Sequence, residues 1–253
     1  MTALYDWAFR YVGSTRSAAL MRIFLALILW YRFSIGSTPS IAHDNIATGF
    51  VFQIAVLCML FGFLSQIATF VAGGCALSTF YYFWGIKGDI AWNHHHTYFV
   101  GMATVLLSMA PCGRSFSIDR LLAIGKARRL GLPEPREEGN LFALRLMALQ
   151  MACMYFFAFW DKAVFANTNN FHYYFLNGTR LQEIITFFYV GSGFIIKPWM
   201  TYMAGFAAMC VVILELVLPL LLIERFQKYL IIPGIGLHLV FYIMLFLQTY
   251  SIS

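Results

Sequence analysis

The chain has 253 residues, of which 61% are hydrophobic and only 11% are charged, and its formal net charge is +6 at pH 7. A soluble domain of this size cannot bury so much apolar surface, because even about 300 residues bury only about three quarters of the surface that the unfolded chain exposes. The composition therefore excludes a water-soluble globule and predicts a protein whose solvent is mostly lipid.

Seven apolar stretches approach the length of about 20 residues that a helix needs to cross the hydrocarbon core of a bilayer. In chain order they lie near 18–35, 45–64, 67–86, 93–111, 141–163, 199–223 and 229–249. We therefore predict an all-α fold, a polytopic integral membrane helix bundle of about seven transmembrane helices. The sequence shows no internal repeat and no shift in composition that would mark a second domain, so a single transmembrane domain is expected over 1–253.

The segment 164–198 matches none of these spans. Residues 165–177 mix aromatic side chains with asparagines and a histidine, and residues 181–194 are apolar but short. Because irregular backbone is not tolerated in contact with lipid, we expect this segment to be extracytoplasmic or to re-enter the membrane under cover of protein. A short or re-entrant helix would then join the seven spans.

The distribution of basic residues predicts the orientation of the bundle. The segment 112–140 is the richest in positive charge, with Arg114, Arg120, Lys126, Arg128, Arg129 and Arg136. We expect this segment to be a basic cytoplasmic loop, which places the N-terminus in the cytoplasm and the C-terminus outside. The net positive charge is then a topology signal, and no nucleic acid is expected as a partner.

Ionisable side chains inside a span cost about 2.5–3.5 kcal/mol each on insertion scales, so each needs a partner or a function. In the predicted orientation the fourth span runs inward from Asn93 and the fifth runs outward to Lys162. His94 and Lys162 therefore reach the same depth and can share a chamber near the outer face. His238 lies near the middle of the last span, and Glu215, about sixteen residues from the outer end of its span, lies nearer the inside.

These residues also have plainer explanations. Consecutive histidines project about 100° apart on a helix, which does not suit zinc, so we expect no metal; they fit interfacial residues after an Asn93 N-cap. Lys162 can extend to the headgroups or pair with the neighbouring aspartate. Arg22 can extend to the cytoplasmic surface or pair with an acid. Glu215 and His238 can form hydrogen bonds between helices.

Several stretches carry a resemblance in collinear order: Leu20–Leu25, Asn93–His94, Ser108–Asp119, Tyr155–Lys162, Leu214–Pro219 and His238. Together they resemble the HTTM (horizontally transferred transmembrane) family, which includes the membrane domain of vitamin K-dependent gamma-carboxylase. The resemblance covers nearly the whole chain. It implies an integral membrane enzyme that couples epoxidation of a reduced quinone to proton abstraction or carboxylation on a peptide or small substrate.

The resemblance also implies roles for individual residues. Lys162 matches the lysine that deprotonates vitamin K hydroquinone, and His94 would be the second catalytic residue. The quinol-binding residues would be Asn93, His238, Glu215, Tyr155 and Trp160. Reduced vitamin K or another quinol would be the cofactor, with O2 and CO2 as co-substrates.

The acceptor substrate stays open. Carboxylases of this type carry a large substrate-binding domain after the membrane region, and this sequence offers none after Ser253. We therefore expect a small substrate or a separate peptide or protein partner. One alternative is a non-catalytic HTTM-type membrane component that assists maturation of a secreted peptide through a partner protein. A transporter is a third class, but the repeats and polar through-path typical of it are missing.

Overall fold

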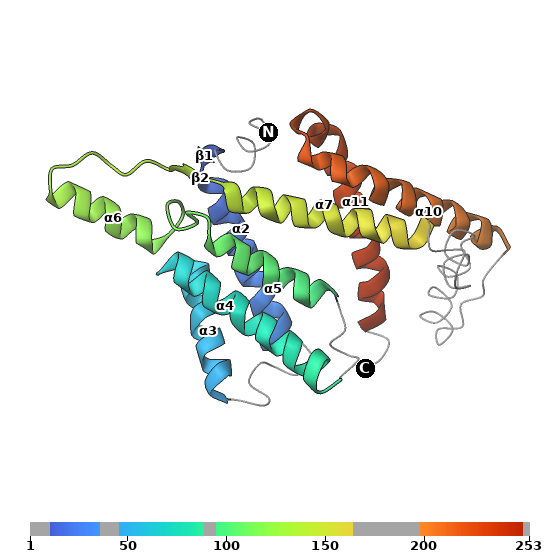
Figure 1. The fold of residues 1–253 in the computed structure, drawn as a ribbon, viewed down its shortest axis with the longest axis horizontal. Helices are drawn as coiled ribbons and strands as arrows, with labels where there is room; N and C mark the ends of the chain where they lie inside the picture. Colours follow the sequence, from blue (N-terminus) through green and yellow to red (C-terminus); the bar gives the residue numbers. More distant parts are fainter. Residues whose placement is uncertain (1–10, 36–45, 89–94, 164–197, 250–253) are drawn as a thin grey trace. The chain divides into compact units, whose positions relative to one another are not determined.

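The computed structural model describes residues 11–35, 46–88, 95–163 and 198–249, which are mostly helical (Figure 1). Contacts divide the chain into two compact units, 1–147 and 148–253. That residues 1–253 form a single transmembrane domain stays a prediction.

The first unit contains, in chain order, β1 (Val12–Ser14), α2 (Arg16–Trp30) with a π-helical turn (Tyr31–Ile35), α3 (Ile46–Phe61), α4 (Ser65–Phe80) with a π-helical turn (Tyr81–Ile86), α5 (His95–Ser108), α6 (Ile118–Arg129) and β2 (Glu138–Asn140). Helix α7 (Phe142–Ala163) begins in the first unit and continues in the second. The second unit then contains α10 (Pro198–Val217), a 3-10 helix (Leu218–Leu222) and α11 (Glu224–Thr249).

A helix lies at the position of each predicted span, so the prediction of a mostly helical fold is confirmed. By length and composition, α7 and the stretch Gly205–Leu222 are able to cross a membrane. The apolar helical stretches Ala47–Phe61 and Thr97–Ser108 are shorter. The crossing of the membrane by all seven spans stays a prediction.

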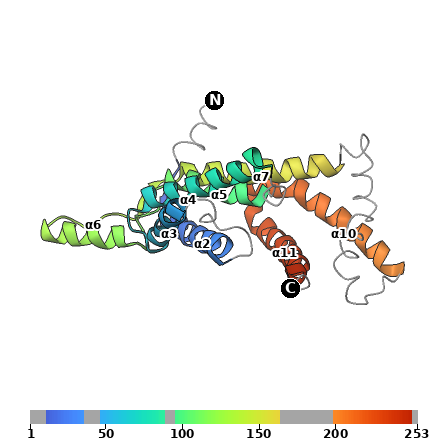
Figure 2. The ribbon, with the colours of Figure 1, turned by 90° about the horizontal axis from the view of Figure 1, so that it is seen from below.

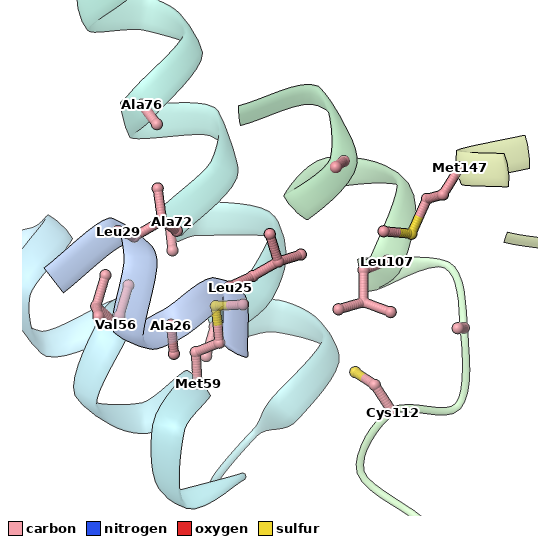
Figure 3. Close-up of a cluster of buried hydrophobic side chains, with 14 of the residues drawn as sticks. Leu25, Ala26, Leu29, Val56, Met59, Ala72, Ala76, Leu107, Cys112 and Met147 are labelled. Atoms are coloured by element: carbon pink, nitrogen blue, oxygen red, sulfur yellow. The ribbon is translucent and has the colours of Figure 1, made fainter. Parts of the chain in front are cut away.

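The core of the first unit lies where α2, α3, α4 and α5 meet. Figure 3 shows Leu29 of α2, Val56 of α3 and Ala72 of α4 gathered in one buried cluster. Because Ala68, Ala72 and Ala76 recur every four residues, they lie on one face of α4, and all three are buried. Their small side chains let the neighbouring helices approach α4 closely.

Glycines bring α4 and α5 closest together. A Cβ added at Gly73 of α4 would lie 2.8 Å from the backbone nitrogen of Val105, and one added at Gly101 of α5 would lie 2.9 Å from Cγ of Leu77. Close approach through small residues is how helices associate in lipid, where apolar surface alone does not drive association.

The outward faces of these helices are also apolar. Phe24 on α2, Ile54 on α3 and Ile67 on α4 are 62%, 60% and 63% exposed. Large exposed apolar surfaces mark sites of contact with another protein or with a membrane. In the first unit this pattern is what a helix bundle in lipid would show.

One of the two predicted explanations for Arg22 was that its side chain extends to the surface, and the structure does not show this. The side chain is fully buried, and Nη2 donates a hydrogen bond of 2.6 Å to the carbonyl of Phe116. Its Nε and Nη1 atoms have no hydrogen-bond partner in the described part of the chain. Gly62 creates the space for the guanidinium, because a Cβ there would lie 1.9 Å from Nη1.

The segment 112–140 was predicted to be a loop, but it contains α6. Ser117 caps this helix, since its hydroxyl accepts a hydrogen bond of 3.0 Å from the backbone N–H of Arg120. Asp119 in the first turn and the basic residues of the last turn complement the helix dipole. Gly131, with φ of +67°, follows the C-terminal end. Hydropathy missed α6 because these signals are polar.

A second boundary also differs from the prediction. The sequence analysis began the last span near 229, whereas α11 begins at Glu224. The residues before the apolar run are polar, but they are compatible with helix, so hydropathy placed the start too late.

Strands β1 and β2 form a short antiparallel ribbon in which Val12 pairs with Asn140 and Ser14 with Glu138. Two ion pairs lie beside the ribbon. The carboxylate of Glu137 lies 2.6 Å from Nε of Arg16 and 3.0 Å from Nε of Arg120. The carboxylate thereby connects the start of α2 with α6.

This carboxylate predicts a pH dependence of stability. The hydrogen bond from Arg16, assisted by the charges of Arg120 and Arg16, holds the pKa of Glu137 below its ordinary value against a smaller opposing effect of desolvation. A lowered pKa in the folded protein contributes stability above the unfolded pKa of about 4.3, and this contribution is lost as pH falls through the folded value. We expect Glu137→Gln to lower the melting temperature at pH 7, and the gap to wild type to close below about pH 4. A gap independent of pH would contradict the assignment.

Candidate functional site

Two polar pairs connect the helices of the second unit. The ammonium group of Lys162 on α7 forms an ion pair with Glu215 on α10. The hydroxyl of Tyr155 on α7 forms a hydrogen bond with Nε2 of His238 on α11, and the two rings lie 5.9 Å apart at an interplanar angle of 54°.

Helix periodicity explains why α7 supplies one member of each pair. Tyr155 and Lys162 are seven residues apart, which is close to two helical turns, so they lie on one face about 10 Å apart along the axis. On α10, Val211 and Glu215 are four residues apart and share a face in the same way. Val211 packs with Tyr155, Leu218 and Leu237 in the apolar cluster of this unit.

The Lys162–Glu215 pair is largely removed from solvent. The side chains are 23% and 8% exposed, respectively. Oε2 of Glu215 is buried and has no hydrogen-bond partner within the described residues. In such surroundings each charge depends on the other, because a buried charge without its partner is strongly destabilising. The carboxylate oxygen that has no partner can accept a further hydrogen bond or a proton.

The ion pair joins two residues that the sequence placed at different depths, Lys162 at the outer end of its span and Glu215 nearer the inside. The contact joins the C-terminal parts of α7 and α10. Two vertical spans that run in opposite directions would hold these ends apart, because sixteen residues of helix correspond to about 24 Å. The depth of either residue in a membrane stays a prediction.

A cavity of about 640 Å³ lies beside the Tyr155–His238 pair. Its wall is formed by α7, the turn at Leu218–Leu222 and α11, and apart from Tyr155 and His238 its side chains are aliphatic. Gly234 lets α11 come close to this turn, since a Cβ there would lie 3.1 Å from Cδ2 of Leu218. The volume is typical of a site for a small organic molecule, and one hydrogen-bonded polar pair in an apolar wall would orient such a molecule.

The structure places four of the predicted site residues in two pairs, Lys162 with Glu215 and Tyr155 with His238, and only the second pair lines the described cavity. Trp160 lies instead against the ring of Phe156, with centroids 6.0 Å apart, and is not part of the described cavity wall. Asn93 and His94 lie outside the described residues, as does the segment 164–197. That His94 and Lys162 share a chamber therefore stays a prediction.

The sequence analysis missed the pairing of Lys162 with Glu215 and the aliphatic cavity. The seven-residue spacing of Tyr155 and Lys162 was a usable signal for one polar face on α7. No spacing could reveal which residue of α10 or α11 would meet that face, because spacing along one helix does not specify how other helices cross it.

No group of three or more His, Cys, Asp or Glu side chains able to hold a metal ion occurs in the part of the chain that the structure describes. Comparisons of the chain with models of protein families, with curated proteins and with solved structures gave no match. The resemblance to the HTTM family therefore stays a prediction.

Proposed function

We propose that this chain is a polytopic membrane enzyme of the gamma-carboxylase type, which couples oxidation of a reduced quinone to proton abstraction or carboxylation on a peptide or small substrate. The observation that carries the proposal is the apolar cavity of about 640 Å³ with the Tyr155–His238 pair in its wall. The HTTM resemblance supplies the reaction class.

The residues present fit a quinol. The aliphatic wall formed by residues such as Met151 and Ile235 suits an apolar ring and its isoprenoid tail. The imidazole of His238 and the phenol of Tyr155 offer a donor and an acceptor for a ring hydroxyl. A bound quinol would supply, through its reaction with O2, the driving force for removing a proton from the substrate.

The chain's own residues would bind and move protons. His238 can accept a proton at one ring nitrogen while the other nitrogen keeps a hydrogen bond, which suits a group that takes a proton from a hydroxyl. Tyr155 fixes the ring through its hydroxyl.

Lys162 matches the base of the carboxylases, but in this structure it is paired. An ammonium group has no lone pair, so Lys162 can act as a base only after its proton has moved to Glu215 or beyond. We propose that the Lys162–Glu215 pair is the proton reservoir of the site: Oε1 of Glu215, which contacts the ammonium group, takes its proton, and the neutral amine can then accept one from the substrate. Oε2, which has no hydrogen-bond partner among the described residues, can accept a further hydrogen bond.

Conversion of a reduced quinone to its epoxide by the purified protein in nanodiscs, with O2, CO2 and a glutamate-containing peptide supplied, tests the proposal. We expect Tyr155→Phe and His238→Gln to reduce kcat/KM about 100-fold, within the range of general acid–base catalysis. Tyr229→Phe is the matched control, because Tyr229 is an exposed residue on α11. It should retain full activity.

Equal activity in all three variants would contradict the assignment of the site. If folded wild-type protein gives no epoxide with vitamin K hydroquinone and with ubiquinol, the enzymatic proposal fails. A non-catalytic membrane component that assists peptide maturation through a partner protein would then be the better explanation.

A further inference from the structure

The first unit contains a second cavity, of about 710 Å³, that the proposed reaction does not use. It lies between the start of α4, the segment 111–120 and residues 135–136. Three arginines line it, Arg114, Arg120 and Arg136, together with a single carboxylate, that of Asp119. The cavity wall therefore carries more positive than negative charge.

Both oxygens of the Asp119 carboxylate accept hydrogen bonds from the start of α4. Oδ1 accepts a hydrogen bond of 2.9 Å from the backbone N–H of Leu64. Oδ2 accepts bonds of 2.8 Å and 2.7 Å from the backbone N–H and the hydroxyl of Ser65. Asp119 thus caps the first turn of α4 and complements the dipole of that helix.

The arginines differ in how they are held. Arg120 pairs with Glu137 and donates to the carbonyls of Arg114 and Pro135 at 3.0 Å and 3.2 Å, so its position is fixed. Arg114 donates to the carbonyl of Glu138 at 2.6 Å, which orients the guanidinium without neutralising it. Among the described residues, no carboxylate forms an ion pair with Arg114 or Arg136.

The remaining wall indicates the rest of the ligand. Leu64, Ile67, Ala123 and two prolines contribute apolar surface, and Leu64 and Ile67 are themselves exposed on the outside of the unit. A guanidinium binds phosphate through two parallel hydrogen bonds. A phosphate group with an apolar body attached therefore matches both parts of the wall.

We propose that this cavity binds the headgroup of an anionic phospholipid, with Arg114 and Arg136 on the phosphate and Arg120 as the residue that positions the segment around them. In the predicted orientation the cavity lies at the cytoplasmic leaflet, where anionic lipids are concentrated. Inorganic phosphate shares the same recognising chemistry, so the experiment includes both sources.

The test measures the melting temperature of the full chain in nonionic detergent against increasing short-chain phosphatidic acid, phosphatidylcholine of the same chain length, or inorganic phosphate. We expect phosphatidic acid to stabilise the wild type, and Arg114→Gln/Arg136→Gln to weaken its binding at least about tenfold, since charge-assisted hydrogen bonds are lost. Arg128→Gln/Arg129→Gln removes the same charge from the exposed last turn of α6, away from the cavity, and should bind as wild type.

Each outcome decides the proposal. Stabilisation by phosphatidic acid but not by inorganic phosphate supports the headgroup, whereas equal stabilisation by both assigns the site to free phosphate and overturns the lipid as ligand. Equal weakening in the two double variants would show binding by general charge and overturn the site. Within the described part of the chain the Arg136 side chain makes no hydrogen bond, so Arg136→Gln alone should keep the melting temperature of the wild type without lipid and lose only binding.

Discussion

Lys162→Ala is expected to lower the free energy of unfolding by about 3–5 kcal/mol and to abolish quinol-dependent activity. The stability loss follows because the substitution leaves the Glu215 carboxylate, with a side chain only 8% exposed, without its partner. Thermal or denaturant unfolding of the protein in detergent, followed alongside the epoxide assay, measures both effects.

Two companion variants separate stability from chemistry. Lys162→Met/Glu215→Leu removes both charges, and replacing a buried ion pair by apolar residues is often neutral or stabilising, so folding should recover while activity stays lost. Lys162→Arg retains the ion pair and the fold, but a guanidinium does not give up its proton. Full activity in Lys162→Arg would show that the charge alone is needed, and would contradict a role in proton transfer.

Apolar runs predicted the helices well because outward-facing and core-facing side chains are both apolar in this chain. Ile54 on the outside of α3 and Val56 in its core are equally hydrophobic, so each span stands out along its whole length. The same property hides which face of a helix is buried. Periodicity is weak when both faces are apolar, and the packing partners could not be predicted.

Polar contacts were harder to predict for a different reason. The Lys162–Glu215 pair joins residues 53 positions apart, and the Thr15–Ser115 hydrogen bond joins residues 100 apart. Such contacts depend on how helices cross, which local sequence does not encode. Local signals were available for the polar face of α7 and for α6, where Ser117 and Asp119 mark a helix start that hydropathy does not register.

Gly62→Ala is expected to destabilise the first unit by about 2–5 kcal/mol. The backbone at Gly62 has φ of +70°, which costs an alanine about 1–2 kcal/mol. The new Cβ would also lie 1.9 Å from Nη1 of Arg22 and 2.4 Å from Cβ of Ser117, so the buried guanidinium must move. Overpacking of this kind costs a further 1–3 kcal/mol, roughly. Unfolding of the two proteins in the same detergent measures the difference.

Gly131→Ala is the matched control for backbone strain. Gly131 has φ of +67°, nearly that of Gly62, but no atom lies within 4 Å of the position its Cβ would take. Its variant should lose only about 1–2 kcal/mol. The free energy of unfolding that Gly62→Ala loses beyond Gly131→Ala then measures the clash. This difference should become smaller in an Arg22→Ala background. It should not vanish, because Ser117 still crowds the site. Equal losses at Gly62 and Gly131 would mean that the Arg22 guanidinium can move away from the new Cβ at no cost, which would contradict the clash as the source of the larger loss.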